Sequence, residues 1–119
     1  MRKAITITSI IISFVFINIA CSKGGSGGGG TSLDCNTVTN KAFAANVSPI
    51  FQASCALTGC HEAGSLNGPG PLTNYNEIFI SRTSIQSAVS SGRMPKTGSI
   101  ATSQKNSILC WIEGGAPNN

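Results

Sequence analysis

The sequence predicts an all-α fold of three to four short helices joined by long loops. No stretch of the chain alternates apolar and polar residues, as a strand with one buried face would do. Residues 64–71 contain three glycines and two prolines, which is the composition of a loop. Beyond residue 45, apolar positions at helical spacing occur in short runs that begin near residues typical of helix caps.

The first predicted helix begins at Ser48 and Pro49. The Ser48 hydroxyl can accept a hydrogen bond from the first turn, and Pro49 suits the first helical position because its missing N–H would have no partner there. A second short helix is predicted after Asn74, because Glu77 follows it at capping-box spacing. The inward positions are Val47, Ile50, Phe51 and Ser54 in the first helix and Ile78 and Phe79 in the second.

Two more helices are predicted toward the C-terminus. One starts at Ser84 and stops at Gly92. The last is capped by Thr102 or Ser103 and ends at the glycines of residues 114–115. We expect its apolar face to pack against the first helix near Phe51. That face consists of Ile108, Trp111 and Ile112.

The N-terminal part of the chain differs in composition from the rest. Residues 1–20 combine a basic start with an uncharged apolar run, which is the layout of a signal peptide that directs export. Residues 21–34 begin with Cys21 and are rich in glycine, as a flexible tether is. The folded domain is therefore predicted over residues 35–119, and its cysteines would meet an oxidising compartment.

The leader and its cysteine resemble those of bacterial lipoproteins, in which a small residue precedes a cysteine that is diacylated. The resemblance implies lipidation of Cys21. It also implies a place in the bacterial cell envelope, anchored to a membrane and facing the periplasm or the cell surface. An uncleaved anchor and a soluble secreted form are the alternatives. From Cys21 onward there are six basic and four acidic side chains without a basic cluster, so no nucleic-acid partner is expected.

The strongest chemical signal is the motif Cys55-Ala-Leu-Thr-Gly-Cys60-His61. In a c-type haem site two thiols add to the porphyrin vinyl groups, and the histidine directly after the second thiol binds the iron. The common spacing has two residues between the cysteines rather than four, and Gly59 can let the extra residues bulge outward. The alternative interpretation is a local disulfide between Cys55 and Cys60 beside a surface histidine.

Other motifs occur in the order found in cytochromes c. Ser-Pro-Ile-Phe at residues 48–51 precedes the first cysteine, and a Gly-Pro loop follows the histidine. Arg-Met-Pro at 93–95 and Trp-Ile-Glu-Gly-Gly-Ala-Pro at 111–117 come after them. From about residue 47 to residue 119, the chain resembles a small monohaem cytochrome c of exported bacterial lipoproteins.

This resemblance implies a cytochrome c-like fold and a role for each site residue. Cys55 and Cys60 would hold one covalent haem c through thioethers, and His61 would be the proximal iron ligand. Met94, the only methionine besides the initiator, would donate its sulfur as the distal ligand. An open distal site, as in a haem peroxidase, is disfavoured by Met94 and by the absence of a second histidine. No enzymatic activity is therefore expected.

The resemblance also implies the surroundings of the two iron ligands. A backbone carbonyl, that of Pro69 or Pro71, would accept the other N–H of the histidine ring. Leu72 would lie against that ring. Arg93 would either reach a haem propionate or lie in solvent.

The chain has five cysteines, so at least one of them lies outside any disulfide. With Cys21 assigned to lipid and two cysteines to haem, Cys35 and Cys110 remain and are expected to form a disulfide. Without haem, the same count allows a second disulfide between Cys55 and Cys60. A zinc site at the haem motif would need a fourth ligand, for which only Cys35 or Cys110 remains.

The function predicted from these patterns is that of a membrane-tethered electron carrier that exchanges electrons with redox partner proteins and is a monomer. The alternative is a disulfide-stapled surface binding module without haem. A domain of 85 residues has a marginal core unless a disulfide, a metal or a cofactor reinforces it. Haem would supply such reinforcement, so the apo-protein is expected to be largely unfolded.

Overall fold

The computed structural model describes residues 32–119. The predicted signal peptide, the predicted lipidation site at Cys21 and most of the predicted tether lie outside the described residues. Within residues 32–119 the chain forms helices and loops and no strand, which confirms the predicted all-α class. No helix in this part of the chain is long and apolar enough to cross a membrane.

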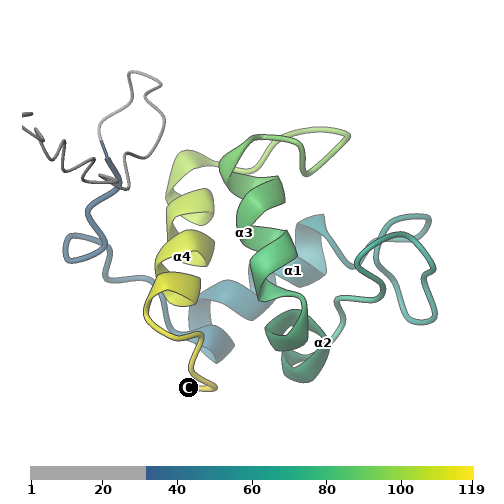
Figure 1. Cartoon of the computed structure of the whole chain (residues 1–119), viewed down its shortest axis with the longest axis horizontal. Coiled ribbons are helices and arrows are strands. Elements are labelled where there is room, and N and C mark those ends of the chain that lie inside the picture. The colour runs from purple at the N-terminus through teal and green to yellow at the C-terminus, as the bar shows by residue number, and fades with distance from the viewer. Residues whose placement is uncertain (1–31) are drawn as a thin grey trace, which may run out of the picture. The chain divides into compact units, whose positions relative to one another are not determined.

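The helices are short and two long loops separate them (Figure 1). A π-helical turn continues directly into the first α-helix, and α3 and α4 stand side by side with α2 at the foot of α3. The loop 91–101 arches over the upper ends of α3 and α4, and the loop 55–74 connects α1 to α2. The elements are η1 (Phe43–Val47), α1 (Ser48–Ser54), α2 (Tyr75–Ile80), α3 (Arg82–Ser90) and α4 (Thr102–Glu113).

The predicted cap of α2 is present, whereas the predicted cap of α1 is not. The Asn74 side chain accepts a hydrogen bond from the Glu77 amide at 3.1 Å, as predicted for α2. Ser48, in contrast, does not cap α1. It lies inside a continuous helical segment, where its own amide donates to the carbonyl of Phe43. The backbone of η1 therefore provides a hydrogen-bond acceptor at the start of α1, which is the role that an N-cap side chain would otherwise have.

The later helices also begin differently from the prediction. Neither Thr102 nor Ser103 caps α4, because Ala101 occupies the N-cap position. The Gln104 side-chain oxygen instead accepts from the Ala101 amide at 2.9 Å. Helix α3 begins at Arg82, earlier than predicted, since one residue serves as the end of α2 and the start of α3. Both helices end just before the glycines that were predicted to stop them.

The hydrophobic core lies where η1, α1, α3 and α4 meet, and Trp111 is 1% exposed at its centre. The Trp111 ring contacts Phe43 of η1, with ring centroids 5.3 Å apart, and Tyr75 at 6.5 Å. Phe51 belongs to the same core, but η1 rather than α1 supplies the main contact with α4, and Ile112 is only half-buried. The core residues are Phe43, Val47, Ile50, Phe51, Leu72, Ile78, Ile85, Val89, Ile108, Trp111 and Ala116.

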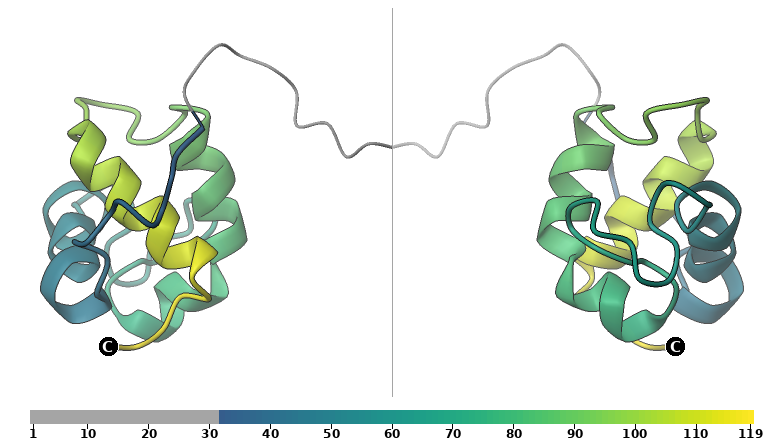
Figure 2. Two further views of the ribbon diagram at one scale, coloured as in Figure 1. Left: turned by 90° about the vertical axis from the view of Figure 1, so that its left-hand side faces the viewer. Right: turned by 90° about the vertical axis from the view of Figure 1, so that its right-hand side faces the viewer.

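The two ends of the described chain are fastened to this core. A disulfide joins Cys35 to Cys110 of α4, which confirms the predicted pair. The segment before η1 crosses the outer side of α4 (Figure 2), and the Lys41 amino group donates to the Cys35 carbonyl at 2.7 Å. At the other end, the Asn119 side-chain oxygen accepts from the Phe43 amide at 2.9 Å.

Candidate functional site

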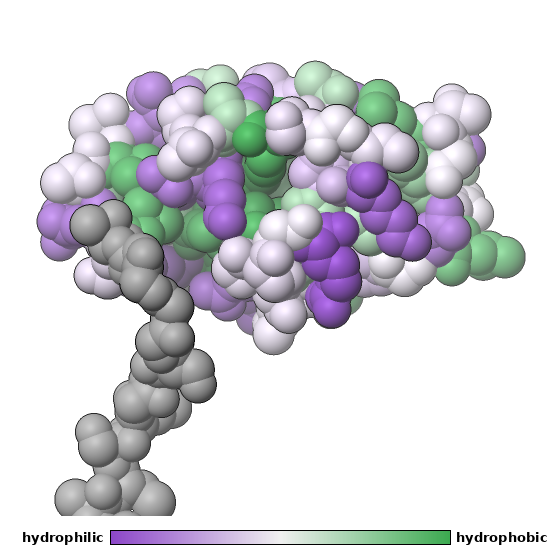
Figure 3. Space-filling view, turned by 90° about the horizontal axis from the view of Figure 1, so that it is seen from above, coloured by the Kyte–Doolittle hydropathy of each residue, from purple (hydrophilic) through white to green (hydrophobic). Residues whose placement is uncertain are grey.

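The two long loops enclose one cavity of about 540 Å³, which is within the usual range for a small-molecule site. Seen from above, apolar side chains form the floor of a recess between polar ones (Figure 3). The cavity brings together all four residues that the sequence predicted as haem ligands, namely Cys55, Cys60, His61 and Met94. Its apolar lining includes Phe51, Leu72, Ile85, Ala88 and Val89.

The wide spacing between the two cysteines is closed by a tight turn. The Cys60 amide donates to the Leu57 carbonyl at 2.9 Å, and Gly59, the third residue of this turn, has a φ of +77°. The His61 amide then donates to the Cys55 carbonyl at 3.1 Å. The additional residues therefore bulge away from the helix end while the backbone at the two ends of the motif stays close, as the sequence predicted for this glycine.

The two cysteines of the motif are separate, half-buried thiols. Neither forms a disulfide within residues 32–119. Burial and the neighbouring Cys60 sulfur raise the pKa of Cys55 to about 11, so this thiol is protonated at neutral pH. Cys35 and Cys110, the only candidates for completing a zinc site, are joined to each other. In the described part of the chain, no group of three or more His, Cys, Asp or Glu side chains is placed to hold a metal ion.

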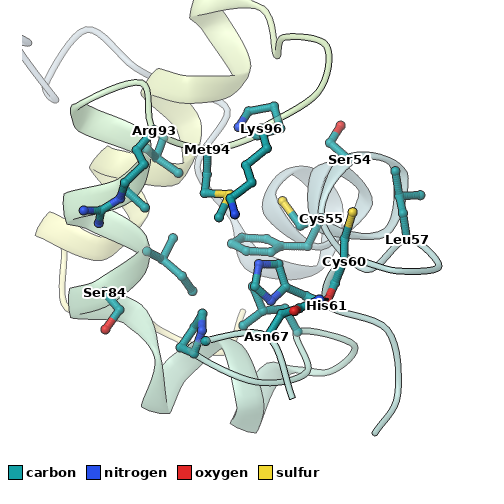
Figure 4. Close-up of a pocket in the computed structure, with 18 of the residues that line it drawn as sticks. Ser54, Cys55, Leu57, Cys60, His61, Asn67, Ser84, Arg93, Met94 and Lys96 are labelled. Atoms are coloured by element: carbon teal, nitrogen blue, oxygen red, sulfur yellow. Dashed lines mark hydrogen bonds between the residues drawn. The ribbon is translucent and has the colours of Figure 1, made fainter. Parts of the chain in front are cut away.

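His61 is 7% exposed and its ring has a fixed orientation. The distance from its Nδ1 to the Gly70 carbonyl oxygen is 2.8 Å. Because a carbonyl only accepts, Nδ1 carries a proton and donates, so in the neutral ring Nε2 is the nitrogen with the lone pair. Nε2 has no hydrogen-bond partner among residues 32–119, and the ring stands in the cavity (Figure 4). This nitrogen is therefore available to a metal in the cavity.

The carbonyl that orients this histidine is not the predicted one. Pro69 and Pro71 were the candidates, and the structure uses Gly70, which lies between them. Gly70 has a φ of +110°, a backbone conformation that a proline at this position could not adopt. In this conformation the Gly70 carbonyl faces the imidazole ring of His61. Leu72 lines the cavity, and its backbone amide donates to the His61 carbonyl at 2.9 Å.

Met94 enters the cavity from the other long loop. Its amide donates to the Ala88 carbonyl of α3 at 3.1 Å, which ties the loop to the end of that helix. Gly92, with a φ of +71°, turns the chain there, and Pro95 limits the backbone after the methionine. The Met94 sulfur and the His61 ring point into the same space (Figure 4). Two potential iron ligands therefore face one cavity from separate loops.

The charged residues that line the cavity are Arg93 and Lys96, and no carboxylate lines it. The Arg93 guanidinium turns away from the cavity, whereas the Lys96 side chain extends across it (Figure 4). Arg93 is exposed, and its contact with a haem propionate stays a prediction. Sequence reasoning missed Lys96, and its place two residues after Met94 is the one signal that could have indicated it.

Asn67 is a second residue that sequence reasoning missed. Its side-chain amide donates to the carbonyls of Gly59 and Cys60 at 3.0 and 2.9 Å. These bonds join the loop after the histidine to the turn before it. Nothing in the sequence separates this asparagine from an ordinary residue of a Gly-rich loop.

Comparison of the chain with protein-family models, curated proteins and solved structures finds no match. Similarity to known proteins therefore assigns neither family nor function. The chemistry of the cavity is the remaining basis for a functional conclusion.

Proposed function

We propose that this protein is an electron carrier with a cytochrome c-like fold that holds one c-type haem in the cavity between its two long loops. One observation carries the proposal. A single apolar cavity is lined by two separate thiols, by an imidazole with a free Nε2 and by a thioether. These are the four groups that covalent attachment and His/Met ligation of a haem require.

The residues present fit this group. His61 would bind the iron through Nε2, and Met94 would bind it through its sulfur. Cys55 and Cys60 would hold the macrocycle by thioethers, for which they must be unpaired thiols. The apolar walls suit a flat aromatic ring, and Lys96 is a cation for the carboxylates at its edge. A bound haem would supply a one-electron couple at its iron.

The chain itself would position the ligands and exclude water. The Gly70 carbonyl fixes the His61 tautomer and makes the ring a stronger donor. The bond from Met94 to Ala88 holds the methionine loop on α3, so that the thioether would close the distal side to small molecules. With that side closed no substrate has access to the metal, which favours a carrier over an enzyme.

The cellular setting belongs to the same proposal. Lipidation of Cys21 would anchor the protein to a membrane of the bacterial envelope, facing the periplasm or the cell surface. The glycine-rich segment after it would let a monomeric domain move between redox partner proteins. The half-buried cysteines lie at the cavity, so electrons would pass through the macrocycle edge next to them.

The test is expression of the full chain in cells with and without a haem-attachment system. The proposal predicts a red protein with sharp reduced absorption bands and with haem that survives acid and acetone extraction. A His61→Ala variant is the matched control, since it keeps both thiols and loses the iron ligand. A colourless wild-type protein with disulfides Cys35–Cys110 and Cys55–Cys60 would contradict the proposal and favour the surface binding module, provided that a control cytochrome with the same spacing matures in that host.

A further inference from the structure

We propose that Asn67 is a positioning residue that holds the wide turn of the haem motif in place, so that both thiols can attach to the same haem. This inference rests on the proposed function and deepens it. The attachment loop has four residues between its cysteines, and its outer part is held by side chains from the loop that follows the histidine.

The contacts of Asn67 are directed at the turn. Its side-chain nitrogen has two hydrogens, and it donates to the carbonyls of Gly59 and Cys60 at 3.0 and 2.9 Å. The Ser65 hydroxyl donates to the same Cys60 carbonyl at 2.5 Å. It also accepts a hydrogen bond from the backbone N–H of Asn67 at 3.2 Å. Asn67 thus links the second cysteine to the loop that also supplies the carbonyl partner of the histidine.

A side chain also binds the backbone N–H of Gly59. The Glu62 carboxylate accepts a hydrogen bond from the Gly59 amide at 2.9 Å. Glu62 and Asn67 therefore bind the N–H and the C=O of Gly59, which has no side chain and is the least restricted residue of the turn. The turn itself contributes one backbone hydrogen bond, from Cys60 to Leu57.

The chemistry explains why such support is needed. In each attachment a thiol adds across a vinyl group, so that sulfur bonds to the inner carbon and the thiol hydrogen goes to the outer carbon. No electrons are gained or lost and no group leaves. The two vinyl groups are at a fixed separation on a rigid ring, so both sulfurs must keep a fixed separation too. A loop with more residues between its cysteines has more conformations to lose, and side-chain bonds to the turn reduce that loss.

The experiment compares the full chain with Asn67→Ala and Asn67→Asp, made in cells with a haem-attachment system. Aspartate keeps the size of asparagine and cannot donate to the two carbonyls. The control is Asn76→Ala, an exposed asparagine of α2 without a side-chain hydrogen bond in the described part of the chain. Free thiols are alkylated with iodoacetamide under denaturing conditions and counted on the tryptic peptide of residues 42–82, in which Cys55 and Cys60 are the only cysteines.

We expect only a small fraction of molecules with an alkylated thiol on this peptide in the wild type and in the control. In both Asn67 variants the fraction with one alkylated thiol should be at least about fivefold higher, the ratio that corresponds to the loss of one ordinary hydrogen bond. The reduced pyridine adduct gives an independent reading, because each unreacted vinyl group shifts its absorption to longer wavelength. A general loss of stability would leave this absorption unchanged.

Each other result has one meaning. Two attachments in the Asn67 variants, or a single attachment in the wild type, would overturn the inference and leave the haem proposal standing. A wild type without covalent haem would refute the proposed function itself. If both variants yield no haem protein, each Asn67 substitution is combined with Cys55→Ala. In that background only Cys60 can attach to the haem. The positioning role predicts no further loss of yield there, whereas an equal loss in that background would overturn it.

Discussion

The Nδ1 atom of His61 lies 2.8 Å from the carbonyl oxygen of Gly70, and this hydrogen bond determines which ring nitrogen is free. Nδ1 must donate because the carbonyl has no hydrogen, so Nε2 keeps the lone pair that a metal needs. The glycine conformation that aims this carbonyl, with a φ of +110°, is one that other residues rarely adopt. One backbone position thus controls the chemistry of the only histidine.

Gly70→Ala is expected to disturb this relationship. A side chain at this φ strains the backbone by roughly 1–3 kcal/mol, although no neighbouring atom would clash with the new methyl group. We expect a lower urea midpoint and, because the histidine becomes a weaker donor, a higher reduction potential. Gly68→Ala is the control, since Gly68 has an ordinary φ and equally open space. Equal urea midpoints and potentials for the two variants would contradict the assigned role of Gly70.

Met94→Ala tests the distal ligand. Loss of the thioether should abolish the near-infrared sulfur-to-iron band of the oxidised protein. It should also lower the reduction potential by on the order of 100 mV, within the range of about 0.8 V that axial ligands span. Thr97→Ala, at another position that lines the cavity, should leave both quantities unchanged. An unaltered near-infrared spectrum in Met94→Ala would mean that another group, or none, binds the distal side.

Breaking the disulfide should destabilise the domain strongly. The bond closes a 75-residue separation, for which loop-closure entropy gives about 4 kcal/mol. Cys35→Ser removes the bond but leaves the buried Cys110 side chain in the core, so core packing is retained. We expect this variant and the double variant with Cys110→Ala to lose similar free energies of unfolding in urea titrations. A much larger loss in the double variant would assign the effect to packing of Cys110 instead.

The features predicted correctly from the sequence are those that neighbouring residues decide. Asn74 and Glu77 are three residues apart and form the predicted cap because both partners belong to the same turn. Cys35 and Cys110 could be paired by counting, since other roles were assigned to the remaining cysteines. Cys55, Cys60, His61 and Met94 were named together because the Cys-His motif is contiguous and Met94 is the only methionine besides the initiator, and the structure places all four at one cavity. Their role in holding haem stays a prediction.

The errors arise where a distant or preceding segment decides. Ser48 does not cap α1 because the preceding turn, η1, already provides carbonyl partners, and this turn shows no clear signal in the sequence. The prediction that Pro69 or Pro71 supplies the carbonyl was wrong, because the direction of a carbonyl depends on loop dihedral angles, which residue types leave undetermined. In the sequence, Lys96 and Asn67 cannot be distinguished from ordinary polar loop residues. Only the fold shows that both line the cavity.

Glu77 predicts a pH dependence of stability. Its carboxylate accepts hydrogen bonds from the amide and the hydroxyl of Thr73 at 2.7 and 2.8 Å, and these bonds lower its pKa below the usual 4.5. A folded-state pKa below the unfolded value adds stability above pH 4.5, which is lost as the pH falls through the folded-state pKa. Glu77→Gln should therefore be less stable than the wild type at pH 7, and the difference should shrink as the pH falls below 4.5 and through the folded-state pKa.

The measurement is the urea midpoint at several pH values between 3 and 7. Glu113→Gln removes a carboxylate elsewhere, at the end of α4, and serves as the control. A Glu77→Gln variant whose deficit stays constant down to pH 3 would show that the hydrogen bonds act without the charge.

If the protein holds haem as proposed, protein made without haem should be largely unfolded. Helix α1 packs on η1 and α3 packs on α4, and the 540 Å³ cavity is lined by residues of both α1 and α3. Without haem, the apolar walls of this recess would face water, and a domain of this size has little other apolar surface to bury. Protein made without haem attachment should therefore have weak helical circular dichroism and no cooperative thermal transition, with the holo-protein as control. Native-like helicity and a cooperative transition in the apo-protein would mean that the disulfide and the aromatic core suffice, and that haem is an addition to a fold already complete.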